Sequence, residues 1–200
     1  MRRKTFDLIT SAIGVGLTLT LILAGGLLMW AAVFTSNEIH NQLATQDVVF
    51  PSAAAFSHAK AGTEITPGMK PYLLKYAGQE VLTGTQAEAY ADHFIAVHLS
   101  EMPYHGVYSK VSAASMADPT NSALAAEVQT TFRGTTLRSM LLEAYGFGTF
   151  GTIAFLASLV SFVRAALLII LSLFGFWHMR RVSLAVELFA SRVESVTTAP

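Results

Sequence analysis

The chain has 200 residues, of which 52% are hydrophobic and 13% are charged, and its formal net charge is zero. Soluble domains carry about 25% charged residues, so this composition argues against an ordinary soluble protein. The chain contains no cysteine, which excludes disulfides, thiol nucleophiles and cysteine metal sites.

Two blocks hold most of the apolar residues, and they cover residues 8–34 and 145–179. Each is longer than the roughly 20 residues that cross a bilayer core. The first also exceeds the apolar region of a cleaved signal, which is about 7 to 15 residues long, so we expect it to be an anchor. The predicted domains are a cytoplasmic N-terminus at 1–7, transmembrane helix 1 at 8–34, an extracytoplasmic helical domain at 35–144, transmembrane helix 2 at 145–179 and a cytoplasmic tail at 180–200.

The cations predict the orientation. Three of them, at positions 2–4, precede the first span, and two, at 180–181, follow the second, whereas residues 35–50 contain no Lys or Arg. The positive-inside rule therefore places both termini in the cytoplasm of a plasma-membrane protein and residues 35–144 outside. That middle segment has six cations and ten carboxylates, which argues against a nucleic-acid partner.

The first helix is expected to continue beyond the bilayer, because Ile39 and Leu43 lie about one turn apart, and to end at Pro51. Prolines and glycines interrupt any period between residues 48 and 71. This segment is predicted to be either an ordered loop or a flexible one.

A helix is predicted at 86–101. Thr85 and Glu88 have the spacing of a capping box, and Pro103 supplies the stop. The apolar residues form two neighbouring stripes, so we expect the helix to pack on two sides. The first stripe holds Tyr90, Phe94 and Val97, and the second holds Ala91, Ile95 and Leu99.

Two further helices complete the predicted all-α fold. A short one is expected at 108–116, closed by Asp118 and Pro119. Asp118 is then expected to cap the next helix, with Pro119 at its first position and Gly134 as a weak point. This last helix is predicted to run without a break from about 137 to 179. The expected architecture is a two-span transmembrane helical hairpin with an extracytoplasmic helical domain between the spans.

The histidines offer one candidate metal site. His93 and His98 are five residues apart and about 140° apart around a helix, so they cannot share an ion. His98, Glu101 and His105 converge only if Pro103 turns the chain, and they would supply the ligand types of an iron or zinc site. Hydrogen-bonding roles are commoner for such residues, and the chain lacks the common nucleophile and phosphate-binding motifs. We therefore expect no metal, no cofactor and no enzymatic activity.

Small residues recur at four-residue spacing on the second span, with Ala154 and Ser158, followed by Phe162, in one series and Ala157, Ser161 and Ala165 in the other. In lipid, close packing of small residues holds helices together. These faces serve either the internal hairpin or a partner. Ser158, Ser161 and Ala165 are accordingly predicted as contacts with a partner or with lipid.

Arg164 interrupts the second span. It lies sixteen residues before Arg180, which at about 1.5 Å per residue places it about 6 Å below the outer edge of a core about 30 Å thick. We expect its guanidinium to reach the outer headgroup region, or an acidic group at that level. The alternative places Arg164 deeper, paired with an acid of a partner, because the first helix offers only apolar residues around Leu23 at that depth.

Five stretches of the chain carry a resemblance to known proteins. In order they are "AGGLLMW", "QLATQDVVFP", "YAGQEVLTGTQAEAYADHFIAVHL", "YSKVS" and "FRGTTLRSMLLEAYGFGTFG". Together they resemble a family of actinobacterial two-span membrane proteins, over nearly the whole chain. Members often carry the label of aromatic ring-opening dioxygenases, which implies an iron site. The family has no known active site, so no functional residue is carried over.

The sequence therefore predicts a non-enzymatic integral membrane protein of the cell envelope, an accessory or scaffold partner of a membrane complex. Its expected partners are the lipid bilayer and a membrane protein or a second copy of the chain. One alternative is a ligand-sensing membrane module, in which the helix around residues 90–99 lines a pocket and the tail after Arg181 carries the output. Another is a metalloenzyme that uses His98, Glu101 and His105.

Overall fold

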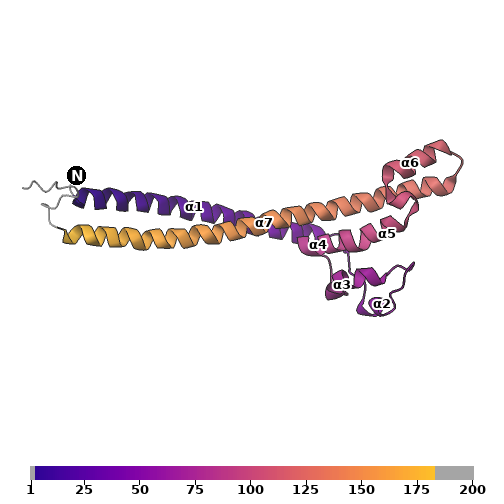
Figure 1. Ribbon diagram of the computed structural model, residues 1–200, viewed down its shortest axis with the longest axis horizontal. Helices are drawn as coiled ribbons and strands as arrows, with labels where there is room; N and C mark the ends of the chain where they lie inside the picture. The colour runs from indigo at the N-terminus through magenta and orange to yellow at the C-terminus, as the bar shows by residue number, and fades with distance from the viewer. Residues whose placement is uncertain (1–2, 183–200) are drawn as a thin grey trace, which may run out of the picture. The chain divides into compact units, whose positions relative to one another are not determined.

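The computed structural model describes residues 3–182, and its regular elements are all helices, as predicted (Figure 1). Two helices are long, α1 (Arg3–Ala44) and α7 (Ser122–Arg181). Between them lie α2 (Ala53–Ser57), η1 (Pro67–Met69), α3 (Lys70–Leu73), η2 (Leu74–Tyr76), α4 (Gly84–Tyr90), η3 (Ala91–Ile95), α5 (Ala96–Glu101), η4 (Pro103–Gly106) and α6 (Tyr108–Ala117). By length and composition, α1 and α7 are consistent with membrane insertion.

The contacts divide the chain into two units. The first, called the two-helix unit, comprises residues 1–30 and 155–200 and is described over 3–30 and 155–182. The second, called the head unit, comprises residues 31–154. Each long helix contributes to both units.

In the two-helix unit, α1 and α7 pack antiparallel. Ser11 meets Gly175, and Gly14 meets Ser172. Further along α1, Gly25 meets Phe162, whose ring carbon lies 3.0 Å from the place where a Cβ would stand. Because only glycine fits at these points, the two backbones can approach closely.

Buried positions in this unit recur every seven residues. On α1 they are Ser11, Thr18 and Gly25, and on α7 they are Ser158, Ala165 and Ser172. A seven-residue repeat keeps one face of a helix against its partner over its whole length. The hydroxyls of Thr18 and Ser158 bond to the carbonyl oxygens of Gly14 and Phe155, both at 2.8 Å, so they are satisfied within their own helices. This set of small residues is called the seam.

The residues predicted to contact lipid or a partner are thus located. Ser158 and Ala165 are 0% and 2% exposed and lie in the seam, and Ser161 is half-buried. The side chain of Arg164 is exposed and has no hydrogen bond or ion pair with another residue of the described part, 3–182. A contact of Arg164 with lipid or with a partner stays a prediction.

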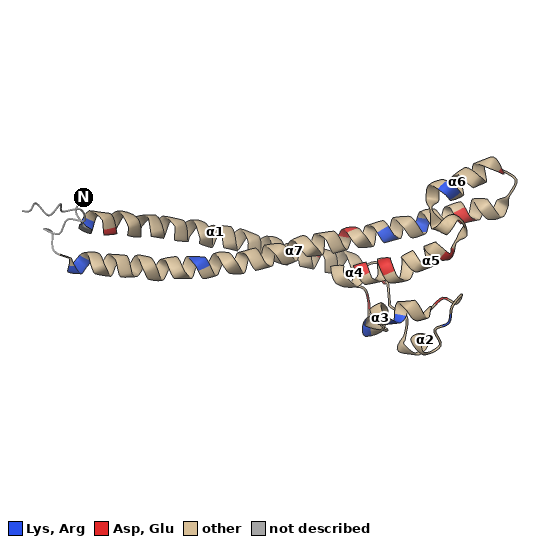
Figure 2. Ribbon diagram, viewed as in Figure 1, with Lys and Arg blue, Asp and Glu red and all other residues tan. Residues whose placement is uncertain are grey.

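The outer surface of the two-helix unit is apolar. Leu19, Leu23, Leu27, Val163 and Leu171 are among its exposed side chains. Charged residues are sparse along both helices of this unit and more frequent in the head unit (Figure 2). At one end His178 Nδ1 lies 2.9 Å from Asp7 Oδ2. Such a surface is suited to lipid, since soluble proteins rarely expose large apolar patches.

Arg164→Leu is expected to leave insertion and topology unchanged. In the register of the seam, Leu21, Ile22 and Leu23 of α1 lie level with Arg164, so the substitution breaks no ion pair with α1. It removes an insertion cost below the roughly 2.5 to 3.5 kcal/mol of a mid-membrane arginine. Labelling single cysteines from each side of the membrane measures the topology. The control is the double change Arg180→Leu and Arg181→Leu, which should disturb it. Failure of Arg164→Leu to insert would contradict this expectation.

The head unit is built around a core formed by α1, residues 50–81, α4, η3 and α7. Its buried residues include Ile39, Leu43, Phe50, Phe56, Ile65, Met69, Leu73, Val81, Ala87, Ala91 and Leu141. Segment 48–71, predicted as an ordered or a flexible loop, is ordered. It forms α2 and η1, and Phe56, Ile65 and Met69 from this segment are buried.

The end of α1 differs from the prediction. The helix stops at Ala44 rather than at Pro51, because Asp47 takes a positive φ of 49° and reverses the chain. The following backbone is then extended beside residues 79–81. Phe50 N bonds to Gln79 O at 2.9 Å and Val81 N to Val48 O at 2.8 Å. These bonds satisfy backbone groups that would otherwise be buried unpaired.

The helix predicted at 86–101 exists as α4, η3 and α5, but its predicted cap is wrong. Thr83 and Gln86 form the capping box, not Thr85 and Glu88. Thr83 Oγ1 accepts a bond from Gln86 N at 3.3 Å, and Gln86 Oε1 accepts one from Thr83 N at 3.0 Å. A glutamine satisfies the box as well as a glutamate does, so the helix begins at Gly84.

The cap of the last helix was also predicted wrongly. α7 begins at Ser122, and Asn121 Oδ1 accepts a bond from Leu124 N at 3.2 Å, which replaces the predicted cap at Asp118. Asp118 instead ends α6. The absence of a break between 137 and 179 is confirmed. Gly134 has a packing role, because a Cβ there would stand 2.8 Å from a methyl group of Leu99.

Gly84→Ala is expected to destabilise the head unit by about 1 kcal/mol, since overpacking a close contact costs about 1 to 3 kcal/mol. The added Cβ would lie 3.0 Å from Ala144 O and 3.1 Å from Tyr145 Cα, which are backbone atoms of α7 that cannot rotate away. The matched control is Gly146→Ala, where a Cβ meets nothing within 4 Å and the helix should gain stability. Thermal unfolding of both variants measures the difference. Equal changes in the unfolding temperature of the two variants would refute the close contact between Gly84 and α7.

Candidate functional site: a cavity in the head unit

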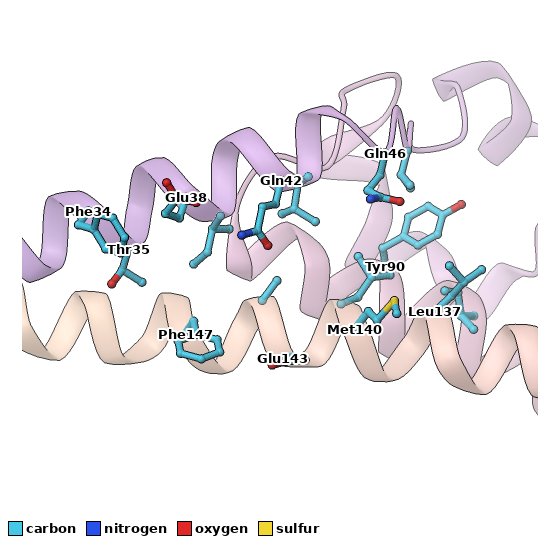
Figure 3. A pocket seen from close by; sticks show the side chains of 16 residues that line it. Phe34, Thr35, Glu38, Gln42, Gln46, Tyr90, Leu137, Met140, Glu143 and Phe147 are labelled. Carbon is cyan, nitrogen blue, oxygen red and sulfur yellow. The ribbon is translucent and has the colours of Figure 1, made fainter.

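The head unit contains a cavity of about 750 Å³ between α1 and α7 (Figure 3). Most of its lining is apolar, with Phe34, Ile39 and Leu43 from α1 and Leu141, Ala144 and Phe147 from α7. The two helices meet closely on one side of it, where Gly151 contacts Thr35 and Gly148 contacts Ile39. The volume is in the range of about 300 to 1,000 Å³ that is typical of small-molecule sites.

Tyr90 and Ile95, from α4 and η3, also line the cavity. The Tyr90 ring is held by Phe50, with centroids 5.4 Å apart and the rings edge to face, and by Phe94 at 4.7 Å. Burial raises the pKa of the Tyr90 phenol above its ordinary value of 10.0, and the Glu64 carboxylate adds to this rise. The phenol is therefore neutral at physiological pH and able to donate a hydrogen bond.

The polar lining is acidic or neutral. Glu38 and Gln42 come from α1, Gln46 comes from the turn that follows it, and Glu143 comes from α7. Figure 3 shows the amides of Gln42 and Gln46 in the space between the two helices. Among the described residues that line the cavity there is no Lys, Arg or His.

A π-helical turn, η3, fixes one wall of the cavity. Asp92 of this turn pairs with Arg138 of α7, with Oδ1 and Nη2 2.6 Å apart. The neighbouring His93 stacks on Tyr72 at a centroid distance of 3.5 Å. These two contacts hold η3 against α7 and α3, and Ile95 is the last residue of this turn. π-Helical turns are rare in proteins, and those that occur often lie at functional sites.

The predicted metal ligands are not brought together. His98 Nδ1 lies 2.8 Å from Phe94 O, and His105 Nδ1 lies 3.3 Å from Ser100 O. Tyr104 and His105 both have a φ of 56°, so the turn after Pro103 is left-handed. Within residues 3–182, no three His, Asp or Glu side chains are placed to hold a metal ion. The structure thus does not bring together His98, Glu101 and His105, the candidate ligands of the alternative metal site.

The cavity is distinct from the other predicted contact residues. Arg164, Ser158, Ser161 and Ala165 belong to the two-helix unit. The ligand-sensing interpretation placed a pocket along residues 90–99, and Tyr90 and Ile95 do line the cavity. The remaining lining residues were missed. The only signal in the sequence is that the apolar Ile39 and Leu43 lie close to the polar Gln42 and Gln46 at the end of α1 and in the turn after it. The tail after Arg181 lies almost wholly outside the described residues.

Comparison of the chain with protein families, with curated proteins and with solved structures gave no match. The resemblance to the actinobacterial two-span family stays a prediction.

Proposed function

We propose that the chain is a non-enzymatic membrane-anchored protein of the cell envelope whose head unit binds an apolar or amphipathic molecule in the cavity. In this proposal α1 and α7 span the plasma membrane, both termini are cytoplasmic and the head unit is outside. The cations at both ends of the predicted spans support this orientation. The cavity itself is the observation that carries the proposal.

The position of the cavity residues in the sequence supports the same view. About 20 helical residues cross a bilayer core, and the stretch 137–147 is more than 30 residues from Arg180. Counted from that cytoplasmic end, the lining residues of α7 fall beyond the lipid core. In this proposal the cavity therefore opens on the extracytoplasmic side rather than within the bilayer.

The chemistry of the lining favours binding over catalysis. The described lining residues offer carboxylates, amides, the Thr35 hydroxyl and the Tyr90 phenol, and none is Ser, Cys, His or Lys. A Ser–His or Cys–His pair, the common nucleophile and base of acyl transfer, is thus missing from the described lining. Mostly apolar walls with a few convergent polar groups are typical of a site that recognises a ligand.

Native mass spectrometry of the full chain, purified in nanodiscs from its own membranes, tests this proposal. The wild type should carry one small-molecule adduct per chain, and Met140→Trp, which places a larger side chain in the cavity lining, should lose it. The control Ile153→Trp changes an exposed residue of the same helix outside the cavity and should keep the adduct. Absence of the adduct, or its persistence in Met140→Trp, would overturn the proposal.

A second function, an accessory or scaffold partner of a membrane complex, is favoured by a separate observation. Phe150 and Ile153 of α7 are 67% and 56% exposed in the head unit and lie outside the cavity lining. Exposed apolar patches commonly mark protein contacts. A photoreactive amino acid at Phe150 should give one discrete crosslinked species in cells, with Tyr72, an exposed residue of α3, as control. Crosslinking to lipid alone would discard this function.

A further inference from the structure

We infer that the molecule bound in the cavity is a single-chain amphiphile with a quaternary ammonium head group. This inference rests on the proposed function and adds the chemical class of the ligand. It is carried by the placement of acidic and aromatic side chains along the two facing helices.

Each long helix contributes one carboxylate and one aromatic ring to the cavity at a spacing of four residues. On α1 they are Phe34 and Glu38, and on α7 they are Glu143 and Phe147. Residues four apart lie on the same face of a helix, one turn from each other. Figure 3 shows the two pairs on the two helices that border the cavity.

The charges next to the cavity favour a cation. Glu38 and Glu143 are the charged residues in its described lining, and Glu64 acts on Tyr90 electrostatically. Arg138, which follows the lining residue Leu137, is paired with Asp92 and so does not offset them. A sulfate or a fatty-acid carboxylate would be repelled by these groups, whereas an ammonium group is attracted.

The aromatic residues favour an alkylated ammonium over a small hydrated cation. Phe34, Tyr90 and Phe147 present rings to the cavity, and aromatic rings attract quaternary ammonium groups by cation–π interaction. The apolar side chains of Ile39, Leu43 and Leu141 supply a surface for an alkyl chain. Both parts of the ligand therefore find a counterpart in the lining.

Photolabelling with three dodecyl probes that differ only in the head group tests this inference. The heads are trimethylammonium, hydroxyl and sulfate, and the full chain is held in phosphatidylcholine nanodiscs. Peptide mapping should place the trimethylammonium label in residues 34–48 and 137–147. We expect this label to be about fivefold stronger than the hydroxyl label, and the sulfate label to be the weakest, because exposed charge pairs contribute modestly.

Variants of the lining carboxylates separate the effect of charge on binding from the effect of cavity shape. The double change Glu38→Gln and Glu143→Gln should remove the preference for trimethylammonium and leave hydroxyl labelling unchanged. Glu101→Gln, which alters an exposed carboxylate outside the cavity, should change neither. Salt at 1 M should also reduce the preference.

The two possible failures differ. Equal labelling of the cavity peptides by all three heads would overturn the ammonium inference and leave the proposed function standing. Absence of label from the cavity peptides with every probe would overturn both.

Discussion

Phe50→Ala is expected to lower the free energy of unfolding of the head unit by about 3 to 5 kcal/mol, the usual cost of deleting a buried phenyl ring. Phe50 is 2% exposed, and its ring lies 5.1 Å from Tyr76 and 5.4 Å from Tyr90 between centroids. The substitution leaves a void at the centre of the core and removes the support of Tyr90. Thermal unfolding followed by circular dichroism in nanodiscs measures the loss.

The matched control for this prediction is Phe132→Ala. The same atoms are removed, but Phe132 is 53% exposed, so a loss below about 1 kcal/mol is expected. A similar loss in the two variants would show that Phe50 does not lie in a packed core.

Ala165→Leu is expected to separate the two long helices within the two-helix unit. Ala165 lies in the seam, and overpacking such a position costs about 1 to 3 kcal/mol. The neighbouring Ala166 is exposed, so Ala166→Leu adds the same atoms where lipid receives them.

Distances between spin labels measure this effect, and the absence of cysteine from the chain makes the labelling selective. Labels on cysteines at Leu19 and Leu167, which are exposed and level in the register of the seam, should give one narrow distance distribution. That distribution should lengthen and broaden in Ala165→Leu and stay unchanged in Ala166→Leu. Identical distance distributions in the two variants would contradict the close packing of α1 and α7 at Ala165.

The long elements were predictable because their signals are long. Apolar blocks of more than 20 residues identify α1 and α7, and the stripes around Phe94 identify the helix that became α4, η3 and α5. The helices between Pro51 and Tyr76 are three to five residues long, which is too short for a period to show. These short helices are held in place by the burial of Phe56, Met69 and Leu73 in the core.

The cavity was harder to predict because its walls come from distant segments. Phe34 and Phe147 are more than 100 residues apart in the sequence, and nothing local indicates that they line one space. Only Tyr90 and Ile95 were expected in a pocket. The arrangement of the candidate ligands His98, Glu101 and His105 was also hidden, since ligand types and spacing do not reveal the left-handed turn at Tyr104 and His105.

Protection of a single cysteine by ligand tests the binding function most directly. A cysteine at Met140 lies in the cavity lining, and one at Ile153 lies outside it on the same helix. A membrane-impermeant maleimide applied to intact cells should label both, which would place the head unit outside. Dodecyltrimethylammonium should slow labelling at position 140 and leave position 153 unchanged. Equal rates with and without the amphiphile, or labelling only after the cells are opened, would contradict a ligand-binding cavity outside the membrane.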